Sequence, residues 1–285
     1  MAPNIKAFGD LYYVAGSYEP GSNSGPLDDK GFLSTTFAYY DDEDNAYFGK
    51  SLKHKRFMTL QDFSSALSLV PAEDICPLLP EVEPLLTVAP DHLNLTPAAE
   101  LKGTYYIKRP QVDSYDWYVE KDIVFAIPQE LLEEAITLQH ITNHEQHKNI
   151  VKYHGCRVRN GRVTGLVFDF YKDSLIYAVK ENKPLDKERI INGLDSAIRH
   201  LHSIGLAHND INPFNIMVDE TSGEPILIDF GSTQKIGAQM TTSRGTPGWM
   251  EDGDDYEISK ESHDLFALDK IRLWLDKPNF DETKG

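Results

Sequence analysis

Residues 208–215 read H-N-D-I-N-P-F-N, and residues 229–231 read D-F-G. Between these two stretches, residues 226–228 form a short apolar run that leads directly into Asp229 and indicates a buried strand. Asp210, Asn215 and Asp229 carry hard oxygen donors, the kind of ligand that suits Mg²⁺. The sequence therefore predicts two short loops that bring two carboxylates and one amide together around a divalent cation.

Apolar residues at helical spacing precede the first of these loops. One set predicts a core-facing helix that ends at Gly205: Ile190, Leu194, Ala197, Ile198 and Leu201. An earlier set predicts a second helix with a proline in its first turn: Pro128, Leu131, Ala135 and Leu138.

Strand patterns come before these helices. Residues 105–107 read as a strand that Pro110 ends, and residues 163–170 read as a buried strand. Asn160-Gly161, just before the second strand, is a strong hairpin-turn signal. Strands first and helices later indicate an α+β protein with two lobes.

The first hundred residues have a different composition, rich in Pro, Gly, Ser and Asp. Two strand-like runs, 32–40 and 46–52, flank the acidic residues 41–45 and predict a hairpin with an acidic tip. We interpret this tip as a solvated turn in preference to a cation site. Residues 19–26 are rich in turn formers and predict a mobile loop.

A short amphipathic helix is expected next, over residues 59–70. Thr59 is a plausible N-cap with Asp62 three residues later, and Pro71 stops the helix. Five prolines between residues 77 and 97 then indicate an extended or looped stretch. These patterns place a boundary near residue 100.

Composition excludes several classes of protein. The 285 residues carry 28 Lys and Arg against 45 Asp and Glu, a net charge of −17, which disfavours binding to duplex nucleic acid or to anionic membranes. The start of the sequence lacks the layout of a signal peptide, and no apolar run reaches the roughly 18 residues of a spanning helix. Two cysteines cannot form a disulfide framework. We therefore expect a cytoplasmic or nuclear protein.

Five stretches in order resemble landmarks of the protein kinase family. Residues 208–215 resemble its catalytic loop, H-R-D-L-K-x-x-N, and residues 229–231 match its D-F-G metal motif. H-K-N-I-V at 147–151 resembles the kinase H-P-N-I-V segment. G-T-P-G-W-M at 245–250 resembles the end of the activation segment. S-H-D-L-F-A-L at 262–268 resembles the buried helix that anchors the catalytic loop through its aspartate, here Asp264.

The resemblance implies a role for each matching residue. Asp210 would accept the proton of the substrate hydroxyl, and Asn215 and Asp229 would hold Mg²⁺. Lys108, which closes the strand at 105–107, would pair with the α- and β-phosphates of ATP, with Glu134 as its partner on the following helix. The cofactors implied are ATP and Mg²⁺.

The helix partner of Lys108 is open to three candidates. Glu134 shares a helix face with Leu138 and Ile141, which would aim its carboxylate inward. Glu130 and Glu133 compete for the same role.

The resemblance also implies an adenine site at the end of the strand at 163–170. Phe168 would be the gatekeeper, and the backbone of Asp169 and Tyr171 would bind adenine. The implied fold is a two-lobed protein-kinase-like α+β fold. Residues 1–100 would be an N-terminal extension (hairpin, short helix, Pro-rich linker), 101–168 a β-rich N-lobe, and 169–285 a helical C-lobe shortened after the Asp264 helix.

Three departures from the family pattern are evident. No G-x-G-x-x-G precedes Lys108, where the only nearby glycine is Gly103. Asn209 replaces the arginine that clamps a phosphorylated activation loop, so activation by loop phosphorylation is not expected. Asn212 replaces the lysine that contacts the transferring phosphate. The chain most resembles a family of small fungal protein-kinase-like proteins, through Y-x-K-R-P at 106–110, residues 208–217 and G-T-P-G-W at 245–249.

Three functions remain open. The first is an ATP- and Mg²⁺-dependent kinase that acts on a Ser or Thr hydroxyl of a protein, and the net negative charge favours a basic substrate. The second is a kinase for a small hydroxylated metabolite, because such enzymes share the H-x-D-x-x-x-x-N loop. The third is a pseudokinase that serves as a scaffold or binding module, which the missing glycine-rich loop and Asn212 favour.

Overall fold

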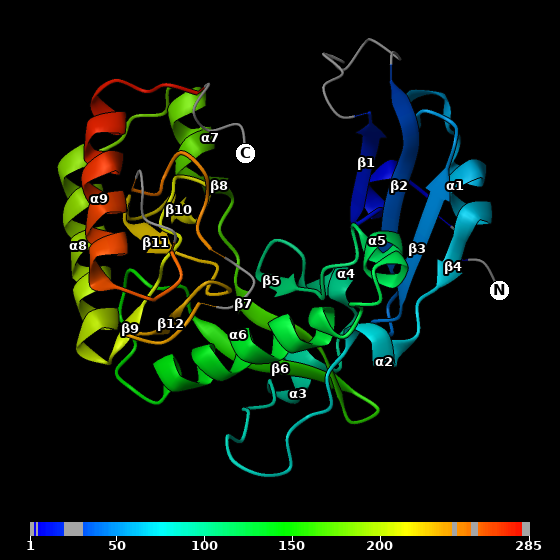
Figure 1. Cartoon of the computed structure of the whole chain (residues 1–285), viewed down its shortest axis with the longest axis horizontal. Coiled ribbons are helices and arrows are strands. Elements are labelled where there is room, and N and C mark those ends of the chain that lie inside the picture. Colours follow the sequence, from blue (N-terminus) through cyan, green and yellow to red (C-terminus); the bar gives the residue numbers. More distant parts are fainter. Residues whose placement is uncertain (1–2, 4, 20–30, 241–243, 252–255, 281–285) are drawn as a thin grey trace.

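The computed structural model describes residues 3, 5–19, 31–240, 244–251 and 256–280. In Figure 1 an N-terminal sheet lies at one end of the molecule and the helices α8 and α9 at the other, with the long helix α6 and a second sheet between them. The α+β class expected from the sequence is confirmed. The turn-rich stretch at 19–26 lies, apart from Glu19, outside the described residues.

The N-terminal sheet has four antiparallel strands in the order β1-β2-β3-β4. They are β1 (Tyr13–Tyr18), β2 (Phe32–Tyr40), β3 (Ala46–Ser51) and β4 (Leu67–Leu69). The hairpin predicted around the acidic tip is therefore present, as β2 and β3. One face of the sheet packs on helix α1 (Leu60–Ala66). One 3₁₀ turn, η1 (Phe8–Asp10), precedes β1, and a second, η2 (Lys55–Phe57), lies between β3 and α1.

Helix α1 begins as predicted, with a capping box between Thr59 and Asp62. The predicted end at Val70 is wrong. The helix stops at Ala66 because residues 67–69 leave it to pair with β3, with Leu67 opposite Gly49.

The interpretation of residues 41–45 as a solvated turn is wrong at Asp44. This side chain is fully buried and forms ion pairs with Arg109, Arg157 and Arg159 of the second sheet region. A carboxylate is buried only where cations and hydrogen-bond donors replace its water, so the hairpin tip is a tether between the two sheets.

One of three one-turn helices, α3 (Asp91–Asn94), interrupts the proline-rich stretch between residues 77 and 97, and the other two, α2 (Ala72–Ile75) and α4 (Ala98–Leu101), lie just before and just after it. Each of the three is preceded by a proline as its N-cap residue. Between them the chain runs along the second sheet, where Cys156 donates its amide to Thr87 O at 2.8 Å.

The second sheet has the strand order β5-β7-β6. Its strands are β5 (Tyr105–Lys108), β6 (Tyr153–Arg159) and β7 (Arg162–Asp169). Asn160 and Gly161 both have positive φ, as the predicted hairpin turn requires. Helix α6 (Ala126–Thr142) packs on this sheet through the predicted apolar stripe, and the shorter helix α5 (Tyr115–Glu120) precedes it.

The C-terminal part is mostly helical. Its helices are α7 (Leu175–Lys180), α8 (Lys187–Ser203) and α9 (Glu261–Asp276). Its strands are β8 (Asp173–Ser174), β9 (Leu206–Ala207), β10 (Ile216–Val218), β11 (Pro225–Leu227) and β12 (Gln234–Lys235). They form the small sheets β11-β10-β8 and β12-β9. One apolar core joins this part to α6, β6 and β7. Within the described ranges, no helix combines the length and apolar character needed to cross a membrane.

Candidate active site

Lys108, at the end of β5, lies between two carboxylates from distant parts of the chain. Its Nζ is 2.7 Å from Glu134 Oε2 on α6 and 2.9 Å from Asp229 Oδ1. Among the three glutamates that the sequence offered, Glu134 is the one that meets Lys108. It faces inward and is only 4% exposed, as the stripe through Leu138 predicted.

The charges of this triad depend on one another. Burial alone would lower the pKa of Lys108, but the carboxylates of Glu134 and Asp229 outweigh it and hold the pKa above its ordinary value. Burial raises the pKa of Glu134 despite the nearby lysine. For Asp229 the balance is reversed, because Lys108 overcomes the effect of burial and lowers the pKa. Lys108 is therefore a fixed positive charge that faces the cavity.

Asp229 is held in a defined orientation by its backbone. Its φ of 62° lies in the left-handed region, which is unusual for a residue other than glycine and is typical of functional sites. The next residue, Phe230, is buried, packs its ring 5.2 Å from that of His208, and donates its amide to Glu134 Oε1. The D-F-G turn thus contacts both α6 and the loop at residues 208–215.

Asp210 accepts hydrogen bonds from three side chains. Thr246 Oγ1 donates to Oδ1 at 2.7 Å, Asn212 Nδ2 to Oδ1 at 3.0 Å, and Asn215 Nδ2 to Oδ2 at 3.0 Å. Burial raises the pKa of Asp210, and the bonds from Thr246 and Asn212 lower it in part. The sequence reasoning gave Thr246 no role at Asp210, although the G-T-P stretch already pointed to this segment.

As expected, Asp264 binds the loop that carries Asp210 and holds it in place. This fully buried carboxylate on α9 accepts the amides of His208 at 2.9 Å and Asn209 at 2.8 Å, and lies 2.9 Å from His202 Nε2. His208 is buried, and its Nε2 forms a hydrogen bond with Ile228 O. Its role is therefore to hold this loop against the strand that leads to Asp229.

Asn209 stands where the kinase family has arginine, and its buried amide side chain connects several segments of the chain. Its Nδ2 donates to Ala207 O, Ser232 O and Ser259 Oγ, and its Oδ1 lies 3.0 Å from His263 Nδ1. The residues after D-F-G and before α9 are therefore bound to the loop without any charged group.

Asn215 and Asp229 lie at adjacent ends of paired strands. Ile228 donates its amide to Asn215 O at 3.0 Å, directly beside Asp229. Asn215 uses Nδ2 and Asp229 uses Oδ1 for the contacts above, which leaves Asn215 Oδ1 and Asp229 Oδ2 as oxygen donors. No cluster of three or more His, Cys, Asp or Glu side chains able to hold a metal occurs in the described part of the chain. One carboxylate plus one amide fits Mg²⁺, which is commonly bound by few protein groups together with substrate phosphates.

A cavity of about 300 Å³ adjoins Lys108. Its lining includes every residue predicted for the nucleotide: Lys108, Glu134, Phe168, Asp169 and Tyr171. Asp229 also lines it, whereas Asp210 and Asn215 do not. Sequence reasoning missed the remaining wall: Tyr106, Val151, Phe170, Met217 and Ile228. The pairing of β5 with β7 places Tyr106 opposite Phe168.

Strand β5 also contacts the N-terminal sheet. Tyr12 bonds the side chain of Tyr106 and the backbone of Arg109, and Tyr40 Oη donates to Pro110 O at 2.7 Å. The cavity at Lys108 is nevertheless lined only from Tyr106 onward, so none of the described residues among the first hundred occupies it.

Comparison with known proteins agrees with this geometry. The protein kinase domain model matches residues 118–253. A probable serine/threonine-protein kinase of Dictyostelium discoideum is 32% identical over 37% of this chain and 8% of its own length. Serine/threonine-protein kinase D of Synechocystis is 30% identical over 38% of this chain and 26% of its own length. A probable serine/threonine-protein kinase, zyg-1, of Caenorhabditis briggsae is 27% identical over 49% of this chain and 21% of its own length.

The matches therefore span about a quarter or less of each of these relatives. Lys108 lies before the matched range, so its position opposite Glu134 and Asp229 is a separate observation. The family model, the serine/threonine kinase relatives and the fold agree that this chain is protein-kinase-like.

Proposed function

We propose that this protein is an ATP- and Mg²⁺-dependent phosphotransferase that moves the γ-phosphate to a Ser or Thr hydroxyl of a protein. The observation that carries the proposal is the position of Lys108 between Glu134 and Asp229, beside a cavity of about 300 Å³. A partly buried, positively charged lysine at a cavity wall suits a polyphosphate better than it suits a purely structural ion pair.

In this proposal the adenine enters the cavity. Phe168 closes its inner end as gatekeeper, and the backbone of Asp169 and Tyr171 binds the base edge. Tyr106 forms a wall of the cavity and is 47% exposed. Its ring offers a stacking surface, which supplies apolar contact where no glycine-rich hairpin covers β5 in the described residues. Lys108, oriented by Glu134, pairs with the α- and β-phosphates.

The metal would be held by Asn215 and Asp229, whose free oxygens suit Mg²⁺. When bound, Mg²⁺ neutralises charge on the phosphates and orients them for in-line displacement. The protein side chains do the remainder: Asn215 joins this site to Asp210 through its amide.

Asp210 is the proposed base. The substrate oxygen attacks the γ-phosphorus, the bond to the bridging oxygen of ADP breaks, and the hydroxyl proton passes to Asp210. The bonds from Thr246, Asn212 and Asn215 hold this carboxylate in place and keep part of its acidity despite burial.

Two observations favour the pseudokinase as a second candidate. No glycine-rich hairpin precedes Lys108 among the described residues, and neutral Asn212 stands where the family has lysine. A kinase for a small hydroxylated metabolite stays open, because nothing among the described residues selects the acceptor.

We also propose the division into an extension (1–100), an N-lobe (101–168) and a C-lobe (169–285).

Binding and transfer are tested separately. Mg-ATP is expected to raise the thermal midpoint of the wild-type protein, and Asp229→Ala to abolish the shift, because a ligand that binds only the folded state stabilises it. Radiolabelled transfer to a basic protein and to a panel of hydroxylated metabolites then distinguishes the two enzyme proposals. Nucleotide binding without transfer to either set of acceptors favours the pseudokinase, and a wild-type protein that does not bind Mg-ATP contradicts both enzyme proposals.

A further inference from the structure

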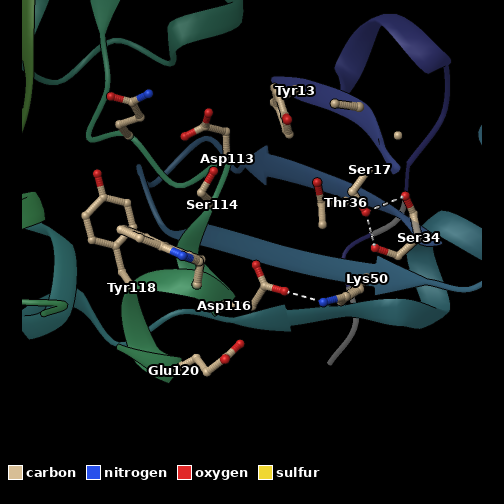
Figure 2. Close-up of a pocket in the computed structure, with 14 residues that line it drawn as sticks. Tyr13, Ser17, Ser34, Thr36, Lys50, Asp113, Ser114, Asp116, Tyr118 and Glu120 are labelled. Atoms are coloured by element: carbon tan, nitrogen blue, oxygen red, sulfur yellow. Dashed lines mark hydrogen bonds and ion pairs between the residues drawn. The ribbon is translucent and has the colours of Figure 1, made fainter. Parts of the chain in front are cut away.

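A groove of about 520 Å³ lies between one face of the N-terminal sheet and helix α5 (Figure 2). Its floor consists of small side chains from β1 and β2, namely Ala15, Ser17, Ser34 and Thr36. The opposite wall comes from the segment 111–120, which includes α5. None of the proposed catalytic or nucleotide-binding residues lines this groove.

The floor continues a sheet face that is packed into the core farther along β2. Alternation along β2 places Ser34, Thr36 and Ala38 on one face. Ala38 is buried in a core cluster with Val112 and Ile127. Ser34 and Thr36 instead line the groove, so the face changes from packed core to open groove within a few residues of the same strand.

The charges in the groove do not balance. Lys50 is the cation among the lining residues, and it is already paired with Asp116 at 2.6 Å, as Figure 2 shows. Asp113 and Glu120 also line the groove. Asp113 forms no ion pair with any described residue, and its Oδ1 is buried without a hydrogen-bond partner, so its negative charge is uncompensated.

Two tyrosines at the groove respond to this charge. The pKa of Tyr13 is raised first by burial and then by Asp113 and Asp116, in opposition to its bond with Thr36. The pKa of Tyr118 is raised by burial, then by Glu130 and Asp113. Asp113 therefore lies close enough to influence one tyrosine of the sheet and one of α5.

Two aromatic side chains, Trp117 and Tyr118, also line the groove. Trp117 is 48% exposed, and its ring lies 5.2 Å from that of Tyr118 in an edge-to-face arrangement. An indole and a carboxylate in one groove suit a guanidinium group, because that group is planar, stacks on aromatic rings and donates hydrogen bonds in its plane. Lysine would satisfy the charge but not the stacking geometry.

We propose that this groove binds an extended, arginine-bearing segment of a partner protein, with the guanidinium between Trp117 and Asp113. The net charge of −17 draws a basic partner toward the chain, and the small floor side chains leave room for its backbone. Gln111 lines both this groove and a cavity of about 200 Å³ that reaches Lys108 and Asp229, so the bound segment adjoins the candidate active site. Binding in the groove requires no phosphoryl transfer, so this inference goes beyond the proposed function.

The test uses the full-length protein and a fluorescein-labelled seven-residue peptide with two arginines among alanines. Binding is measured by fluorescence anisotropy in 0.15 M salt, where long-range attraction is screened beyond about 8 Å. Asp113→Asn and Trp117→Ala are each expected to weaken binding about tenfold. A peptide with citrulline in place of arginine, which keeps the shape without the charge, is expected not to bind.

Asp42→Asn is the matched control, because it removes the same charge from an exposed residue outside the groove. It is expected to change affinity less than twofold. Thermal midpoints check that each variant folds, and the isosteric Asp113→Asn keeps the test valid if Trp117→Ala does not fold. The inference is overturned if Asp42→Asn weakens binding as much as Asp113→Asn does, if the citrulline peptide binds equally well, or if the wild-type protein binds neither peptide. Mg-ATP is then added to the bound peptide. Displacement of the peptide by the nucleotide would place the peptide in the cavity at Lys108, and this result also contradicts a separate groove.

Discussion

Asp44, at the tip of the β2–β3 hairpin, binds Arg157 of β6 through both of its carboxylate oxygens. Arg157 Nε lies 3.0 Å from Oδ2 and Nη2 lies 3.2 Å from Oδ1. The same carboxylate binds Arg109, which directly follows Lys108 at the end of β5. Asp44 therefore joins the N-terminal sheet to the strand that carries the candidate phosphate-binding lysine.

Asp44→Ala is expected to destabilise the folded protein by about 3–5 kcal/mol, because it leaves buried arginines without a counter-charge. Chemical denaturation measures this loss. Asp42→Ala, an exposed substitution two residues away, is expected to change stability by less than about 0.5 kcal/mol. Equal effects of the two substitutions would show that the buried ion pairs contribute nothing.

Glu134→Gln removes one of the two carboxylates that hold Lys108. The lysine then loses the opposite charge that most strongly raises its pKa, and its orientation is set by Asp229 alone. We expect Mg-ATP affinity or transfer to fall about tenfold or more, with the fold retained. Glu133→Gln is the control, because Glu133 bonds only Gln129 on the same helix among the contacts seen. The role of Glu134 is refuted if both variants behave alike.

The acid limb of the pH–rate profile is expected to report Asp210. A base must be ionised, so kcat/KM rises with pH up to the pKa of Asp210 and then levels off. Thr246→Val removes a hydrogen bond that lowers this pKa, so the limb is expected to move to higher pH. Thr246→Ser retains the hydroxyl and is expected to restore the wild-type limb. A limb that stays in place in Thr246→Val would assign it to another group.

Asp210→Asn is expected to have opposite effects on activity and stability. Transfer is expected to fall by about 10² to 10⁴. Because the folded-state pKa of Asp210 is raised, the folded state binds its proton more tightly than the unfolded state. Stability therefore falls as pH rises from the unfolded-state pKa to the folded-state pKa, and the loss persists above it. Asparagine removes this penalty, so the thermal midpoint at pH 7 is expected to rise. A lower midpoint would show that the ionised carboxylate stabilises the fold.

Asn209 is expected to make loop phosphorylation unnecessary. Its bonds to Ser232, Ser259 and His263 are internal and involve no carboxylate, lysine or arginine. Phosphatase treatment is therefore expected to leave activity unchanged. Asn209→Ala is expected to cost about 1–3 kcal/mol in denaturation, because buried partners lose their hydrogen bonds. A phosphatase-sensitive wild-type protein would contradict this view of the junction.

Much of the candidate site could be predicted because it depends on local sequence. The loop at 208–215, the D-F-G turn and the hairpin at Asn160-Gly161 each occupy a few consecutive residues whose backbone preferences are set by their own side chains and neighbours. The stripe on α6 likewise favoured Glu134, because helical periodicity determines which residues share a face.

Other features depended on contacts between distant segments. Nothing near Asp44 distinguishes it from its exposed acidic neighbours, and its burial follows only from the approach of Arg109 and Arg157 more than sixty residues away. The same is true of Thr246 at Asp210 and of Tyr12 at Tyr106. Local chemistry thus determined most of the turns, strands and helices, whereas contacts between distant segments decided where α1 ends and which polar groups lost water and had to find partners. That choice is a property of the assembled fold, because the cost of burying a charge appears only when the two surfaces meet.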